Sequence, residues 1–286
     1  MPRAPHRAPP SASLPAPSEP EPPARPRERR QRVQSAATGM AVLKALARLG
    51  GQASLTALAA QVDESPAKVH RYLVSLVEEG LVVQQAGSQL YRLGLEALQI
   101  GLAAMRQADP IRAAEASLVR LRERLEVTCF VAVMGNKGPT IVRFEEPGLP
   151  VTVNVRVGSV LPLLWSATGR VFLGLLDAAR VQGLAAEELA QATPEQRAQL
   201  DPRDPIGRLR ETVRAGGCAA VRDTNLKGIS AVAAPVFDCH GRLCAVMAAL
   251  GATGGFDPAL DGPVALALRE EALAVSRELG YGGAAD

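Results

Sequence analysis

The chain has 286 residues, a length that allows two folded domains. Its 32 basic and 29 acidic side chains give a formal net charge of only +3, which excludes a general polycation, so any affinity for nucleic acid must come from a local patch. No apolar run reaches about 18 residues and the N-terminus lacks the apolar region of a secretory signal, so we expect neither a membrane span nor secretion. Four cysteines are too few for a disulfide framework in such a chain, which favours the reducing cytoplasm.

Residues 1–32 contain ten of the 22 prolines and seven arginines, but few large apolar side chains. This composition cannot offset the entropy cost of ordering and predicts a disordered Pro/Arg-rich tail. The arginines from Arg25 to Arg32 lie directly before the first predicted helix, where they suit a phosphate or minor-groove contact. A solvated tail that only keeps the protein soluble fits the same composition.

Residues 33–93 have the pattern of three short helices followed by two strands. The first helix is expected from Ser35 to Gly50, and the second follows Ser54 as its N-cap. Two strand-like runs, 81–85 and 89–93, enclose a turn and predict a hairpin. This order predicts a winged helix-turn-helix. The stripes expected to face its core are Met40, Leu43, Leu46 and Leu49; Leu55, Leu58, Ala59 and Val62; and Val69, Leu73, Leu76 and Val77.

The third helix is expected to begin after Ser65, with Pro66 at its first position, and to end at Gly80. In a helix-turn-helix this helix enters the major groove, and the side chains opposite its buried stripe reach the bases. Arg71 and Lys68 are the strongest candidates because both donate hydrogen bonds to guanine edges or phosphates. A winged helix that binds another protein is the alternative. The residues expected to contact DNA are Ser65, Lys68, Arg71, Tyr72 and Ser75, with Arg92 in the wing.

Residues 94–108 are predicted to form a linker helix. Its Leu95, Leu98, Leu102 and Met105 are spaced by three, four and three residues, as in an a/d seam. The seam could join two copies of the chain or cover its own domain, and two heptads do not decide between them.

Residues 109–280 alternate between helical and strand patterns. Turn sequences at 135–138 and 238–241 join neighbouring strands, so we expect a largely antiparallel sheet in an α+β sensor-like domain. The expected strands are 127–134, 140–145, 151–155, 229–237 and 243–250, and the later expected helices are 166–176, 187–190, 205–215 and 258–279.

Several strings of this sequence occur in a recognisable order between Val33 and Leu279: VQSAATGMAVLKAL, VHRYL, LVEEGLV, YRLG and GISAVAAPVFD. Together they resemble the isocitrate lyase regulator (IclR) family of bacterial transcription factors. The resemblance implies a winged helix-turn-helix, a linker helix and a C-terminal GAF-like domain that binds a small effector, assembled as dimers or tetramers. Members often have Lys, Ser and Thr where this chain has Pro66, Ala67 and Lys68, so the operator sequence does not carry over.

The segment 161–170 passes from an apolar run into a helix N-terminus. Free backbone N–H groups there, together with the helix dipole, form a natural cradle for a carboxylate, although Ser166 could be no more than an N-cap. The resemblance places the effector pocket at this segment. Several members have polar side chains where Ala231 and Ala248 stand, so we expect a less polar effector, an aromatic or aliphatic acid. The expected effector-binding residues are Ser166, Ala167, Thr168, Gly169, Asp223, Ala231, Ala248 and Leu250.

Two other classes of protein are alternatives to this interpretation. A small-acid-processing enzyme would need a nucleophile beside a base, yet the only histidines are His6, His70 and His240. The spacing of Cys239, His240 and Cys244 matches no standard pair of zinc half-sites, so no metal or cofactor is expected. The second alternative is a DNA-binding protein whose C-terminal domain only oligomerises.

The sequence therefore predicts a cytoplasmic transcriptional regulator with no catalytic residues. We expect its partners to be a double-stranded, palindromic operator and a small organic acid, and its assembly to be a homodimer or homotetramer, because two-fold symmetry presents two identical reading heads.

Overall fold

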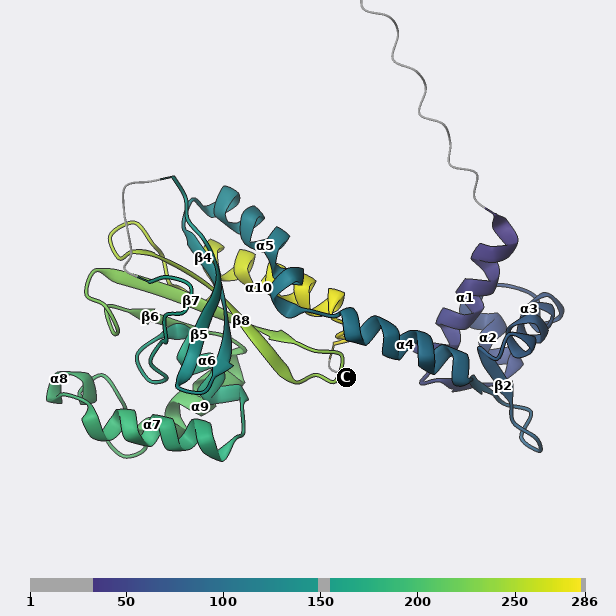
Figure 1. Cartoon of the computed structure of the whole chain (residues 1–286), viewed down its shortest axis with the longest axis horizontal. Helices are drawn as coiled ribbons and strands as arrows, with labels where there is room; N and C mark the ends of the chain where they lie inside the picture. Colours follow the sequence, from purple (N-terminus) through teal and green to yellow (C-terminus); the bar gives the residue numbers. More distant parts are fainter. Residues whose placement is uncertain (1–32, 149–154, 284–286) are drawn as a thin grey trace, which may run out of the picture. The chain divides into compact units, whose positions relative to one another are not determined.

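The computed structural model describes residues 33–148 and 155–283 and divides into two compact units, Met1–Gln99 and Ile100–Asp286 (Figure 1). The predicted tail lies outside the described residues, as does the strand expected at 151–155 except for Val155. No described helix is both long and apolar enough to cross a membrane.

The first unit confirms the predicted winged helix-turn-helix. Its small sheet is antiparallel in the order β1-β3-β2, and its three helices pack around one apolar core. Its elements are α1 (Gln34–Arg48), β1 (Gln52–Ala53), α2 (Leu55–Val62), α3 (Pro66–Glu78), β2 (Val82–Gln84) and β3 (Tyr91–Leu93).

The predicted N-caps of α2 and α3 are confirmed. The Ser54 hydroxyl accepts the Ala57 N–H at 3.2 Å, and the Ser65 hydroxyl accepts the Lys68 N–H at 3.4 Å. These bonds satisfy backbone donors that have no partner within the helix and fix where each helix begins.

Part of the predicted core is wrong. Met40, Leu49 and Val77 are exposed, at 46%, 38% and 39%. A strict three-residue spacing advances about 300° per step, so the stripe predicted for α1 rotates away from the core. The stripe that is buried in α1 combines three- and four-residue steps and consists of Thr38, Gly39, Val42, Ala45 and Leu46.

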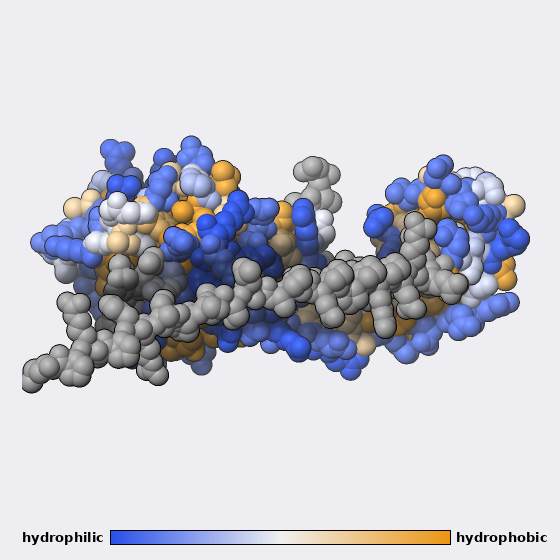
Figure 2. Space-filling model, turned by 90° about the horizontal axis from the view of Figure 1, so that it is seen from above, coloured by the Kyte–Doolittle hydropathy of each residue, from blue (hydrophilic) through white to orange (hydrophobic). Residues whose placement is uncertain are grey.

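Helix α4 (Leu95–Gln107) spans the boundary between the two units and contains no buried residue. Its four seam residues are between 44% and 64% exposed, and Ile100 is 60% exposed. Elsewhere the surface is mainly hydrophilic in the view of Figure 2, with hydrophobic side chains in small separate areas. The seam therefore does not cover its own domain within the described residues.

The second unit is built on a five-stranded sheet in the order β5-β4-β8-β7-β6, with every neighbouring pair antiparallel. This confirms the predicted α+β class. The four-residue strand β6 was not predicted because so short a run carries little alternation. The strands are β4 (Thr128–Gly135), β5 (Gly138–Glu145), β6 (Ala219–Arg222), β7 (Ile229–Phe237) and β8 (Leu243–Ala252).

Helices cover both faces of this sheet (Figure 1). Because side chains alternate along a strand, Cys129 and Val131 of β4 face one layer, while Phe130 and Ala132 face the other. The first layer consists of α5 (Pro110–Leu125) and α10 (Pro263–Glu278). The second consists of α6 (Ala167–Leu175) and α9 (Pro205–Gly216), with α7 (Ala179–Gln191) beside α6, and the short α8 (Pro194–Arg197) follows α7.

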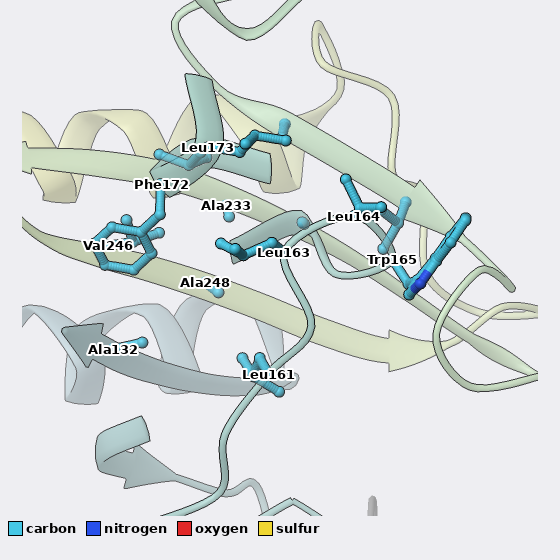
Figure 3. Packing of buried hydrophobic residues seen from close by; sticks show 14 of the residues in the cluster. Ala132, Leu161, Leu163, Leu164, Trp165, Phe172, Leu173, Ala233, Val246 and Ala248 are labelled. Atoms are coloured by element: carbon cyan, nitrogen blue, oxygen red, sulfur yellow. The ribbon is translucent and has the colours of Figure 1, made fainter. Parts of the chain in front are cut away.

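Three helix expectations are corrected. α7 begins eight residues before the predicted helix at 187–190, α8 was not predicted, and α10 begins at Pro263 rather than at 258. The chain between β5 and α6 matters most for function. Its segment 161–165 runs over the sheet without being part of it, and Leu163 lies with Phe172 and Leu173 above Ala233, Val246 and Ala248 (Figure 3).

Candidate functional site

Helix α3 presents one exposed face. Val69, Leu73 and Leu76 are buried, which leaves Arg71 and Ser75 exposed on the opposite side. Other exposed residues of this helix, among them His70 and Val74, were not in the predicted DNA-contacting set. The exposure of His70 supports a place beside that set.

Lys68 lies at the start of the same helix but is not free. Its Nζ atom lies 2.6 Å from Oε1 of Glu64, and both side chains are partly buried. The sequence contains this i, i+4 spacing, which favours such a pair. Arg71 has no ion pair within the described residues, so it is the cation of this face that is available to a phosphate or a base.

The other predicted contacts lie in different environments. Tyr72 is half-buried and packs against the core of the unit, so it was wrongly grouped with the outward side chains. Ser65 uses its hydroxyl as the N-cap of α3. Arg92 is exposed on the central strand β3, opposite Gln52 and Val83.

A cavity with about 420 Å³ of empty space, part of it open to solvent, lies in the second unit. It is bounded by the N-terminus of α6, by β7 and β8, and by the loop that follows β6. Within the described residues its lining is apolar apart from Ser166, Thr168 and Asn225 and contains no ionisable side chain. The other lining residues are Phe130, Val155, Leu161, Ala167, Val221, Leu226, Ile229, Ala231 and Leu250.

The N-terminus of α6 meets the cavity at Ser166, Ala167 and Thr168. The Ser166 hydroxyl is fully occupied, because it donates to the Pro162 carbonyl at 2.7 Å and accepts the Gly169 N–H at 2.9 Å. Gly169 therefore cannot offer its N–H to a ligand. The N–H groups of Ala167 and Thr168 belong to the first turn and have no acceptor within the helix.

Thr168 adds an unused polar group to this turn. Its side chain lines the cavity although the residue is only 2% exposed, and its hydroxyl forms no hydrogen bond with any described residue. A hydroxyl at the edge of a cavity can donate a hydrogen bond to a ligand.

The structure brings together five of the eight predicted effector residues: Ser166, Ala167, Thr168, Ala231 and Leu250 all line the cavity. Ala248 lies on the same face of the sheet but is fully buried beneath the 161–165 segment (Figure 3). Asp223 is exposed and accepts hydrogen bonds from the Gly228 N–H and the Thr253 hydroxyl, so it shapes the loop. That loop supplies Asn225 and Leu226 to the cavity lining, and no sequence pattern indicated these two residues.

Side chains hold the 161–165 segment in place. The Glu188 carboxylate of α7 accepts the N–H groups of Leu163 and Leu164 at 2.7 and 3.1 Å, and the Thr224 hydroxyl lies 2.5 Å from the Trp165 carbonyl oxygen. Burial raises the pKa of Glu188, although the two N–H donors oppose that shift. The first turn of α6 therefore depends on contacts from α7 and from the loop after β6.

Comparison with known proteins gives a consistent result. The model of the IclR helix-turn-helix domain matches residues 35–86, and the model described as bacterial transcriptional regulator IclR C-terminal matches residues 102–277. The crystal structure of Pseudomonas aeruginosa HmgR is similar, with 43% sequence identity, a TM-score of 0.81, and coverage of 88% of this chain and 100% of that one.

Curated relatives are named as regulators. The probable transcriptional regulator SauR of Cupriavidus necator is 28% identical over 72% of this chain and 81% of its own length. The HTH-type transcriptional regulator XynR of Escherichia coli is 24% identical over 87% of this chain and 98% of its own length.

Proposed function

The chain belongs to the IclR family of bacterial transcriptional regulators, and we propose that it binds its operator as a homodimer or homotetramer and responds to an aromatic or aliphatic carboxylic acid. In this proposal α3 enters the major groove, α4 joins two copies, and the acid occupies the cavity at the N-terminus of α6.

The proposed class of effector rests on the composition of the cavity lining. Two N–H groups and the Thr168 hydroxyl lie at one end, where the helix dipole favours a negative charge by about 0.3–1 kcal/mol. The remaining lining is apolar, and its burial against a hydrocarbon group contributes roughly 25 cal/mol per Å². A keto acid would place a further polar oxygen against this apolar lining, so a less polar acid fits better.

The exposed seam of α4 supports dimerisation. Leu95, Leu98, Leu102 and Met105 follow an a/d pattern and are unburied in the single chain. Pairing two such helices would cover these side chains and present two α3 helices to a palindromic operator. Light scattering should give the mass of a dimer or a tetramer for the wild type, and Leu98→Glu should lower it. Gln99→Glu, on the same helix, is the matched control and should leave it unchanged.

The decisive experiment measures binding to the DNA that flanks the protein's own gene, at two salt concentrations, with competitor DNA and a panel of aromatic and aliphatic acids. We expect competitor-resistant binding that one class of acid changes. Arg71→Ala should reduce operator affinity about 10- to 100-fold, as the loss of one good base contact does. Lys137→Ala removes one positive charge from the second unit and should leave operator affinity unchanged.

Two results would contradict the proposal. If DNA binding depended only on salt and not on the DNA sequence, the proposal that the protein recognises a specific operator would be contradicted. Operator binding that no acid alters, with no acid bound to the protein, would favour a C-terminal domain that only oligomerises.

A further inference from the structure

Arg170 holds a partly buried positive charge behind the wall of the effector cavity. It is the fourth residue of α6, and long side chains on a helix extend toward the helix N-terminus. Its Nε donates to the Leu164 carbonyl at 2.9 Å and its Nη1 to the Ala220 carbonyl at 3.4 Å. The guanidinium group therefore bridges the segment before α6 and the strand β6.

Both ends of this bridge lie next to the cavity. Leu164 is two residues before Ser166, and Ala220 directly precedes Val221; Ser166 and Val221 line the cavity. Arg170 does not line it. Its charge therefore acts on a bound molecule from behind the wall, and its hydrogen bonds hold two parts of that wall together.

The charge has no anionic partner in the described part of the chain. Arg170 is bonded there only to backbone carbonyls and forms no ion pair. Burial without a carboxylate lowers its pKa, yet an arginine stays charged at neutral pH. Even a partly buried cation without a counter-ion carries a desolvation cost, so an anion bound nearby would be favoured.

The carboxylates of the neighbouring segments are engaged elsewhere. Glu188 accepts the N–H groups of Leu163 and Leu164, and Asp223 accepts from Gly228 and Thr253. Among the described residues, the cavity lining itself contains no ionisable group. Neutral donors leave both carboxylates charged, and the dipole of α6 and Arg170 are the two contributions of positive sign that favour an anion in the cavity.

We propose that Arg170 is a positioning residue that makes this cavity select an anion over a neutral molecule of the same shape. It acts through its unpaired charge and through the Leu164 and Ala220 carbonyls. The inference rests on the proposed function, since it concerns the acid bound in the same cavity. It adds that the charge of the effector is recognised largely by a residue the effector does not touch.

The test compares each acid with its amide, because the two differ in charge but little in shape. Calorimetry with the full-length protein uses benzoate and benzamide as one pair and hexanoate and hexanamide as the other. The measured quantity is the ratio of acid affinity to amide affinity. We expect the wild type to prefer the acid at least tenfold in the pair that fits the cavity.

Three variants separate charge from structure. Arg170→Gln removes the charge but keeps a donor for a carbonyl, and should reduce the ratio at least about threefold, leaving the preference that the α6 dipole supplies. Arg170→Lys keeps the charge and loses the bridge, so both affinities fall while the ratio stays within about threefold of the wild type. Arg222→Met removes a positive charge from the exposed end of the same strand, β6, and should leave the ratio unchanged because solvent screens it.

A measurement on the wild type remains valid even if a variant fails to fold. A charge behind the cavity wall is screened little by salt, so the ratio should persist between 50 and 500 mM sodium chloride; collapse of the ratio to one would overturn the inference. An unchanged ratio in Arg170→Gln, or equal binding of acid and amide by the wild type, would also overturn it while leaving the proposed function intact. If no pair binds, the carboxylic-acid effector and this inference fail together.

Discussion

The Nζ atom of Lys68 lies 2.6 Å from Oε1 of Glu64, so an acid on the chain before α3 restrains a cation of the DNA-reading helix. Glu64 precedes the N-cap Ser65 and lies at the end of α3 where the helix dipole favours a negative charge. The pair leaves Arg71 as the unpaired cation of this face. Contact with a phosphate would require Lys68 to leave or share Glu64.

Glu64→Gln should therefore strengthen DNA binding. The freed Lys68 can neutralise one more phosphate, which steepens the slope of log K against log salt by about 0.9. We expect about threefold tighter binding at low salt and little change in operator preference, because a phosphate contact carries no sequence information. Fluorescence anisotropy at several salt concentrations measures both quantities.

Glu79→Gln is the matched control, since it removes an acid at the other end of α3 that forms no ion pair in the described chain. Its slope should equal that of the wild type. An equal rise in affinity for both variants would mean that only the net charge matters, and the role of the Glu64–Lys68 pair would be contradicted.

Gly169→Ala should unfold or rearrange the effector cavity. A Cβ at this position would overlap the Pro162 carbonyl oxygen and the Leu163 Cα, and both are backbone atoms that cannot turn aside. We expect a loss of about 2 kcal/mol or more in unfolding free energy, as overpacking costs. Trp165, the single tryptophan of the chain, is buried in the preceding segment and reports the urea transition by fluorescence.

Gly183→Ala is the control for this change. Nothing lies within 4 Å of a Cβ at Gly183, which is in the interior of α7. Alanine there should stabilise the protein by roughly 0.5–1 kcal/mol, because glycine weakens a helix interior. A Gly169→Ala protein as stable as this control would show that the segment moves easily, contrary to the contacts described.

Features set by residues close together in the sequence were predicted better than features set by contacts between distant residues. Ser54 and Ser65 were identifiable as N-caps because the bond they accept lies three residues away. The outward orientation of Met40 and Leu49 was not identifiable, because which face of α1 is buried depends on packing against distant residues.

The same limit applies to the candidate site. Ala231 and Leu250 came from the family resemblance, and Ser166 to Thr168 from a local helix-start pattern. Glu188 and Arg170 were missed because each acts on a backbone carbonyl or N–H that no side-chain pattern reveals. Asn225 and Leu226 line the cavity only because Asp223 and Thr224 fix the course of their loop.

Thiol reactivity should distinguish the four cysteines. Burial raises the pKa of Cys129 to about 12, and burial followed by the charge of Asp238 raises that of Cys244 to about 11. Both are protonated at pH 8 and react slowly, since the thiolate is the nucleophile. Cys218 is buried and Cys239 is exposed.

A disulfide reagent at pH 8 should therefore label one thiol per folded chain quickly and all four after denaturation. Cys239→Ser should remove the fast reaction. A fast reaction that survives in this variant would show that Cys244 or Cys218 is more accessible than the structure describes.

Glu188→Ala should destabilise the segment that precedes α6. Without the carboxylate, the N–H groups of Leu163 and Leu164 lose their acceptor, and each unsatisfied donor costs about 1–3 kcal/mol. Glu187→Ala, the exposed neighbour on the same helix, should change the unfolding free energy by no more than about 0.5 kcal/mol. Urea titration followed by Trp165 fluorescence compares the two, and equal stabilities would remove Glu188 from the support of the cavity.

The pH dependence of the stability of Glu188→Gln tests whether burial raises the pKa of Glu188. Burial raises the pKa of Glu188 in the folded state, so the folded chain holds this proton more tightly than the unfolded chain. Its contribution to stability is present below the unfolded pKa, near 4.5, and decreases as the pH rises through the folded value. Glu188→Gln removes that titration, so its stability relative to the wild type should increase from pH 4.5 to pH 7.5. A difference that stays constant over this range would show that the carboxylate is not perturbed by burial, and one of the opposite sign would show that the two N–H donors dominate.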